Sequence, residues 1–149
     1  MSLAPTFGIE ATPAAGAPSH LATLLLAKQG GVKFTYVPYK GTQPALVDVG
    51  GGHVNLLLDS MISVLPLAKG GKVKPIAITS KKRSALAPDV PTVQEAGVAN
   101  FAYESWYGVW APKGTPPAVV KRLHDAFKQA MEQESYKTAL ARYDMVPMY

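Results

Sequence analysis

Three short polar turns hold the residue types that could do chemistry in this 149-residue chain. The first is Thr12–Ser19, in which alanine, glycine and proline predominate, the second is Lys40–Thr42, and the third is Asp59–Ser60. Each turn is predicted to lead into a helix, where unpaired backbone N–H groups and the helix dipole favour a carboxylate or phosphate. Small side chains in the first turn let such a group approach the backbone. The turns therefore predict a binding surface for a small anion rather than a catalytic centre.

Each turn also has a simpler interpretation, which the sequence leaves open. The first two turns could be ordinary connections between a strand and a helix, because such motifs often occur without a ligand. Ser19 could be the N-cap of its helix, and Asp59 could cap the helix that follows it. As a functional group, Asp59 would accept a hydrogen bond from a ligand or hold an ordered water. The motif G-x-x-x-x-G-K-[ST] is absent, so none of the turns is a P-loop.

The sequence gives no support for an enzyme, a metal site or a cofactor. Ser19 and His20 are neighbours, but adjacent residues at a helix start point to different faces, and the nucleophile motif G-x-S-x-G is absent. The three histidines lack the spacing of metal ligands. The absence of cysteine excludes disulfides, thiolate metal sites and cysteine catalysis. A small enzyme that uses the loop 12–20 is the least favoured hypothesis.

Composition is typical of a folded domain with a core, since 48% of the residues are hydrophobic and 17% are charged. No apolar run approaches the roughly 20 residues of a membrane span. The opening residues MSLAPTFGIEAT lack the basic and long apolar regions of a signal peptide.

The net charge of +5 is unevenly distributed. Six basic residues and no acidic residue lie between Asp59 and Asp89. They could form a solvated edge, or they could attract an anionic ligand over a long range. No aromatic residue is interleaved with them, so a nucleic-acid partner is not predicted.

Apolar runs that alternate with amphipathic segments predict strands and helices in turn. Strands are predicted over Phe7–Ala11, Phe34–Pro38, Val54–Leu58 and Lys74–Thr79. Helices are predicted between them, over His20–Gln29, Gln43–Val49 and Met61–Lys69. This order is typical of an α/β fold, a parallel sheet covered by helices. Open α/β sheets bind ligands at the carboxyl ends of their strands, so the three turns are expected to meet there.

The last third of the chain is predicted to contain a short helix, a strand and two further helices. Thr92 would cap the short helix, and an aromatic strand is expected over Glu104–Ala111. A proline-rich linker leads to a helix that begins with Thr115 as N-cap and ends near Gln133. The last helix is predicted over Ser135–Tyr143.

Apolar side chains in this part need a partner surface. Trp106, Tyr107 and Trp110 would pack in a core or a domain interface, with stacking on a ligand as the alternative. An apolar stripe runs along the following helix from Val119 to Met131. If these side chains stay uncovered, we expect the chain to self-associate.

Three segments resemble, in order, the motifs of the Bug-type extracytoplasmic solute-binding proteins. They are VPYKGTQPALVDVGGGHVNLLLDS, IAITSKKRSALAPDVPTVQEAG and ESWYGVWAPKGTPPAVV. These proteins are the receptor subunits of tripartite tricarboxylate transporters. The resemblance implies a type II periplasmic-binding-protein fold, in which two α/β lobes are hinged around a ligand. It implies that the chain is a fragment, with residues 7–103 as the second lobe and residues 104–149 as a hinge strand and C-terminal helices of the first lobe.

The resemblance also implies a function. The chain would belong to a periplasmic, non-enzymatic receptor that captures a small carboxylate or a related metabolite and docks on the permease subunits of a transporter. The alternative is a sensor module that presents its ligand to a signalling protein. In the family, ligand carboxylates meet backbone N–H groups and waters at loops that follow strands. The matching positions in this sequence are Thr12, Ala15, Gly16, Ser19, Lys40, Gly41, Thr42, Asp59 and Ser60.

Overall fold

The computed structural model describes residues 6–146 and divides the chain into two compact units. Unit 1 is Met1–Glu104 and unit 2 is Ser105–Tyr149. The elements of unit 1 are β1 (Thr6–Thr12), α1 (Pro18–Gly30), β2 (Lys33–Pro38), α2 (Thr42–Gly50), β3 (Leu56–Leu57) and α3 (Met61–Lys69). Unit 2 contains α4 (Pro117–Glu132) and α5 (Glu134–Ala141).

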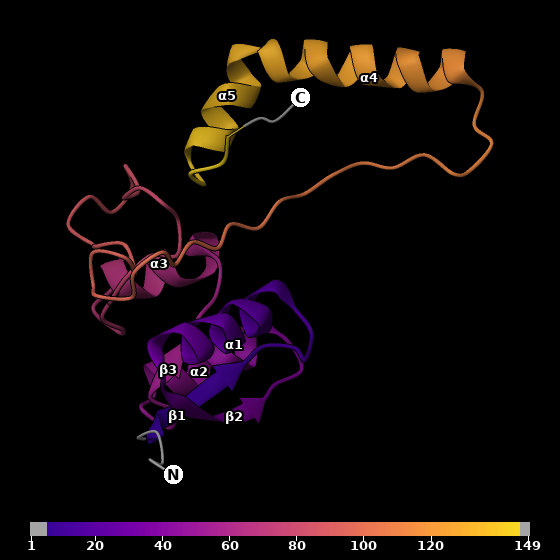
Figure 1. The fold of residues 1–149 in the computed structure, drawn as a ribbon. Coiled ribbons are helices and arrows are strands. Elements are labelled where there is room, and N and C mark those ends of the chain that lie inside the picture. The colour runs from indigo at the N-terminus through magenta and orange to yellow at the C-terminus, as the bar shows by residue number, and fades with distance from the viewer. Residues whose placement is uncertain (1–5, 147–149) are drawn as a thin grey trace. The chain divides into compact units, whose positions relative to one another are not determined.

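The sheet of unit 1 is parallel, with strand order β2-β1-β3 (Figure 1). β1 is central and pairs with both neighbours, so that Thr12 lies opposite Pro38 and Ala11 lies opposite Leu57. β3 is short, but the Asn55 N–H extends its contact with β1 by donating to the Ile9 carbonyl oxygen at 3.0 Å. The predicted α/β fold with a parallel sheet is therefore confirmed.

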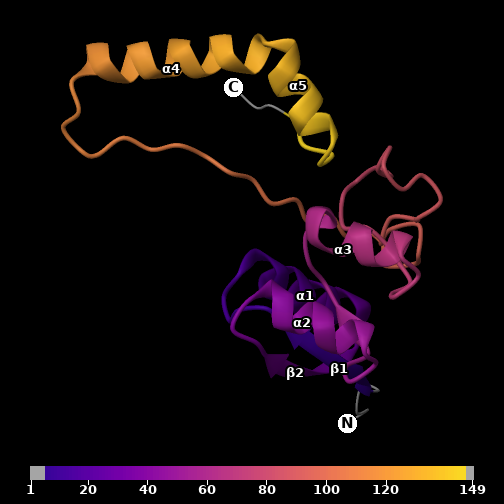
Figure 2. The same cartoon turned by 180° about the vertical axis from the view of Figure 1, so that it is seen from behind.

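Small side chains form the core beneath α2. Ala11 of β1 and Ala45 of α2 are fully buried and lie in one cluster with Val54. Alanines on both elements let the helix approach the strand closely, and Tyr39 and Leu57 close the edges of the cluster. Because neighbouring strand residues point to opposite faces, Glu10 lies on the other face of β1, where α1 supplies Thr23. Figure 2 shows α1 and α2 from behind.

The predicted fourth strand, Lys74–Thr79, is wrong. Residues 74–77 have no strand structure, and Ile78 forms only an isolated parallel bridge with Thr92. Pro75 supplies no N–H for a strand ladder, which explains why pairing does not extend toward Lys74. The backbone bonds of Ile78 go instead to Pro91 and Val93.

The predicted caps have mixed outcomes. Thr92 caps its segment as predicted, since its hydroxyl accepts from the Glu95 N–H at 3.1 Å while Glu95 accepts from the Thr92 N–H at 2.7 Å. This segment is a turn rather than a helix. Ser19 is not an N-cap, because α1 begins at Pro18 with Ala17 at the cap position. Thr115 is also not a cap, since its hydroxyl donates to the Pro112 carbonyl oxygen at 2.8 Å.

The aromatic segment Glu104–Ala111, predicted as a hinge strand, has no strand structure. A strand needs a hydrogen-bonding neighbour, and within residues 6–146 no segment pairs with this one. Trp106, Tyr107 and Trp110 are between 66% and 82% exposed.

Unit 2 exposes an apolar surface along α4. None of the residues of α4 and α5 is buried, although α4 is clearly amphipathic. The exposed apolar side chains of this helix are Val119, Val120, Leu123 and Phe127. Within residues 6–146, no helix is both long enough and apolar enough to cross a membrane.

We expect the 149-residue chain to self-associate in solution, because exposed apolar patches beyond about 400 Å² promote association. Light scattering coupled to size exclusion should detect dimers or larger species. The double variant Leu123→Glu with Phe127→Glu should shift the chain toward the monomer, whereas Lys121→Glu, a charge change on the polar face of the same helix, should not. A wild-type chain that stays monomeric at the highest attainable concentration would contradict this expectation.

Candidate functional site

The three predicted turns lie at one edge of the sheet of unit 1. β1, β2 and β3 run parallel, and they end within one residue of one another: Thr12 pairs with Pro38, and Leu57 pairs with Ala11. Two backbone hydrogen bonds join the first turn to the second. The Tyr39 N–H donates to the Thr12 carbonyl oxygen at 2.9 Å, and the Gly41 N–H donates to the Pro13 carbonyl oxygen at 2.8 Å. These bonds place the first two turns side by side, and the third turn follows β3 on the other side of β1.

The first turn is exposed at its tip and anchored at its base. Thr12 is buried, and its hydroxyl donates to a Glu10 carboxylate oxygen at 2.6 Å. Ala15 and Gly16 are exposed. The Gly16 N–H donates to Nδ1 of His20 at 3.0 Å, so this amide is already engaged and His20 has a structural role. Ser19 lies in the first turn of α1, where N–H groups have no intrahelical acceptor.

The second turn contains a glycine with a positive backbone angle. Gly41 has φ +121° and occupies the N-cap position of α2. Its N–H was expected to be free for a ligand, which is wrong, because it donates to Pro13. Thr42 begins the helix, so its N–H points out of the first turn and needs an acceptor from outside the helix. The Lys40 side chain is exposed beside it in the sequence.

The third turn carries an unpaired acceptor. One carboxylate oxygen of Asp59, Oδ1, accepts from the Ser60 N–H at 2.6 Å. The other, Oδ2, is buried and has no hydrogen-bond partner in the part of the chain that the structure describes. A buried polar atom without a partner is unfavourable, so this oxygen is suited to a donor from a ligand or an ordered water. The Ser60 hydroxyl is exposed and lies 3.0 Å from that of Ser63.

A buried acid that the sequence reasoning missed lies beneath these turns. Glu10 is fully buried and accepts hydrogen bonds from the hydroxyls of Thr12 and Thr23, at 2.6 and 3.3 Å. Burial raises the pKa of Glu10 above its ordinary value of 4.5, while these bonds, a bond from the Leu58 backbone and the nearby His20 act in the opposite direction. The available signal was a single acidic residue inside the apolar strand FGIEA.

The site offers backbone donors, hydroxyls, one exposed cation and one open carboxylate oxygen. This donor set suits a small organic anion that also carries a hydroxyl or another proton donor. Among residues 6–146, no group of three or more histidine, aspartate or glutamate side chains could hold a metal ion.

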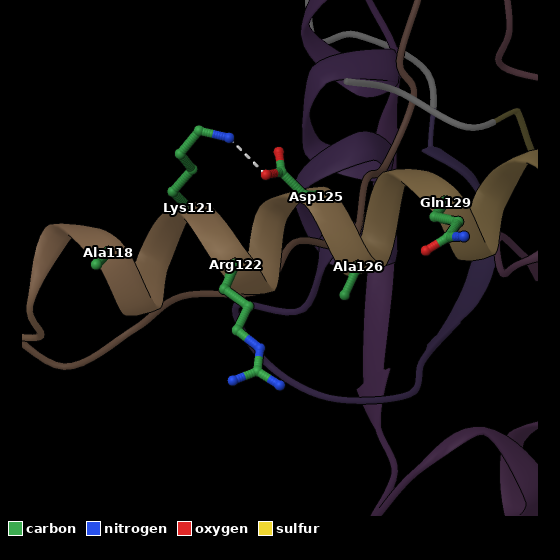
Figure 3. A pocket seen from close by; sticks show the side chains of 6 residues that line it. All are labelled: Ala118, Lys121, Arg122, Asp125, Ala126 and Gln129. Atoms are coloured by element: carbon green, nitrogen blue, oxygen red, sulfur yellow. Dashed lines mark hydrogen bonds and ion pairs between the residues drawn. The ribbon is translucent and has the colours of Figure 1, made fainter.

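A shallow hollow elsewhere in the chain lies on α4 and includes none of these residues (Figure 3). Lys121 Nζ lies 2.6 Å from Asp125 Oδ2 within it. All the residues that line this hollow come from one helix, so it is part of an open helix surface rather than an enclosed site. They are Ala118, Lys121, Arg122, Asp125, Ala126 and Gln129.

Comparison with known proteins agrees with this fold. The family described as the tripartite tricarboxylate transporter family receptor matches residues 9–149. The chain belongs to this family. The resemblance of the sequence motifs to Bug-type solute-binding proteins is thereby confirmed, and the relatives include the protein BugT of Bordetella pertussis, 35% identical over 135 residues.

Other members of the receptor family are similar over nearly the whole chain. A Cupriavidus necator protein, described as the UPF0065 protein in the gbd 5' region, is 41% identical over 130 residues, which are 87% of this chain and 39% of that protein. A solved R. palustris protein with adipate superposes with a TM-score of 0.84 at 34% identity and covers 94% of this chain and 47% of its own. MatC from Rhodopseudomonas palustris with bound malate gives 0.79 at 34% identity, covering 93% and 48%. The chain therefore spans about half the length of these relatives or less.

Gly41 gives a direct test of the geometry of the second turn. We expect Gly41→Ala to lower the free energy of unfolding by about 1–2 kcal/mol, because a side chain is strained at its positive φ. Gly50→Ala is the matched control, since a Cβ there would lie at an ordinary 3.7 Å from a Leu67 methyl group. Urea unfolding measures both. Equal stabilities for Gly41→Ala and the wild type would rule out this conformation of the turn.

Proposed function

We propose that this chain binds a small dicarboxylate at the edge of the unit 1 sheet as part of a solute-binding receptor. The observation that carries the proposal is the register of the three strands, which end within one residue of one another and so bring three helix-starting turns to one edge. Helix N-termini favour anions at such an edge. The relatives solved with adipate and with malate support a dicarboxylate as the ligand class.

The nine predicted residues have different proposed roles. Ala15 and Thr42 supply backbone N–H donors, and Ser19 and Ser60 supply hydroxyls. Lys40 supplies an exposed positive charge. The remaining residues shape the site or accept from the ligand: Gly16 and Gly41 form the turns, Thr12 anchors the first turn, and Asp59 accepts through Oδ2.

The receptor as a whole is proposed to work by closure of two lobes. Residues 7–103 would form one ligand-binding lobe, and residues 104–149 would belong to the other. A ligand that contacts both lobes stabilises the closed state, which gives specificity without catalysis. The closed receptor would deliver its ligand in the periplasm to the permease subunits of a tripartite transporter.

Binding by the 149-residue chain is expected to be weak, with a Kd in the millimolar range. Each exposed contact with a helix N-terminus contributes about 0.3–1 kcal/mol, so a few such contacts give low affinity. Titration of ¹⁵N-labelled chain with malate or adipate should shift the backbone amides of the three turns in a saturable manner. Succinamide, a neutral molecule of similar length to malate, should not produce these shifts.

A charge variant tests the position of the ligand. Lys40→Gln should weaken malate binding about two- to fivefold, because it removes an exposed cation beside the second turn. Lys69→Gln, which removes another exposed lysine of unit 1, should leave the affinity unchanged. Saturable shifts confined to other residues, or equal effects of the two variants, would contradict the proposed site.

A further inference from the structure

Glu10 is a fully buried acid at the centre of unit 1, and none of the proposed ligand contacts uses it. It lies on the central strand β1, two residues before the first turn begins. A buried carboxylate is unfavourable unless hydrogen bonds satisfy it. Glu10 meets this condition with three donors, namely the hydroxyls of Thr12 and Thr23 and the backbone N–H of Leu58.

The three donors lie on β1, on α1 and directly after β3, and each leads to a turn of the site. Thr12 is the first residue of the first turn. The Thr23 hydroxyl shares its one proton between the Glu10 carboxylate, at 3.3 Å, and the Ser19 carbonyl oxygen, at 3.0 Å, so it connects Glu10 to the first turn of α1. Leu58 directly precedes Asp59 in the third turn. One side chain therefore connects the first turn to the third across the sheet.

We propose that Glu10 is a positioning residue of the anion site, whose ionised carboxylate holds the first and third turns at a fixed separation so that their donors converge on one ligand. The proposal deepens the proposed function and rests on it. Ionisation matters because a carboxylate accepts from all three donors, whereas a carboxylic acid must use one oxygen as an O–H donor. Protonation would therefore break or reverse one of the three connections.

Several titratable groups surround Glu10. His20 faces it from α1, and Tyr36 of β2 has its pKa raised by burial and by the charge of Glu10. β3 itself contributes no titratable side chain, and Asp59 follows it. α2 covers the opposite face of β1, where its Asp48 accepts from the Tyr39 hydroxyl at 2.6 Å.

The charge of Glu10 alone would have the opposite effect on ligand binding. A negative charge beneath an anion site repels the ligand, so a purely electrostatic role predicts that Glu10→Gln tightens malate binding. A positioning role predicts that the same variant weakens it. The sign of the change therefore separates the two roles.

The first measurement is a pH titration of the wild-type chain without ligand, from pH 7.5 down to pH 4. The ¹⁵N amide chemical shifts are recorded at each pH. The amides of the first turn and of residues 58–60 should titrate together with one midpoint above 4.5, since burial raises the pKa of Glu10. The separation of the turns is then fixed above this midpoint and is lost as the pH falls through it. The amides near Glu95 are the internal control, because hydrogen bonds from Thr92 and Arg83 lower the pKa of that acid.

The second measurement compares malate affinity at pH 7.5 between variants. Glu10→Gln should abolish the shared titration and weaken malate binding about tenfold. Loss of a residue that orients binding groups without touching the ligand has an effect of about this size in metal sites. Glu95→Gln makes the same change of net charge within unit 1 and should do neither. If Glu10→Gln fails to fold, Thr23→Val removes one donor and should raise the shared midpoint, because the ionised form loses a hydrogen bond.

Each outcome separates this inference from the proposed function. Independent titration of the two turns in the wild type, or unchanged or tighter malate binding by folded Glu10→Gln, would overturn the positioning role. A shared midpoint in a chain that shows no malate binding would support the structural connection and refute the proposed function instead.

Discussion

The parallel pairing of β1 with both of its neighbours is the constraint on which the rest of the site depends. The last residues of β1 and β2, Thr12 and Pro38, are direct partners, and the β1–β3 register brings Leu58 to the same level. Each strand then continues into a turn and a helix, so three sets of helix N-terminal groups meet at one edge. A shift of one residue in this register would turn Glu10 toward α2 and Ala11 toward α1, and both faces of β1 would lose their partners.

The two faces of β1 are unlike in chemistry. On one face, Ala11 and Ala45 pack closely and hold α2 against the strand. On the other face, Glu10 is satisfied by hydroxyls and a backbone amide from the elements around it. The apolar face supplies stability through burial, and the polar face supplies directional bonds that fix the turns. The proposed anion site needs both, because backbone donors on an unsupported loop would not converge on one ligand.

Much of the fold could be predicted from local patterns in the sequence. Apolar runs bounded by glycines identified the three strands and the helices between them, and parallel α/β geometry then brought the turns together. Contacts between distant residues could not be predicted in this way. The Gly41 N–H was expected to face a ligand, yet it donates to Pro13, a residue 28 positions away. Likewise, nothing local to Glu10 indicates that Thr23 and Leu58 will satisfy it.

The wrong predictions have physical reasons of the same kind. Lys74–Thr79 has the composition of a strand, but Pro75 interrupts the donors and Ile78 bonds to residues 91 and 93 instead. The segment Glu104–Ala111 has aromatic residues that favour strands, but strand structure also requires a neighbouring strand. Composition therefore predicted the preference of each segment, and the available partners decided its structure.

The most direct test of the account is a crystal structure of the 149-residue chain grown with saturating malate. The account predicts malate at the sheet edge of unit 1, with a carboxylate within hydrogen-bonding distance of the Ala15 or Thr42 N–H and a donor of the ligand facing Asp59 Oδ2. Malate bound only elsewhere, or an empty edge whose three turns are free of lattice contacts, would contradict it.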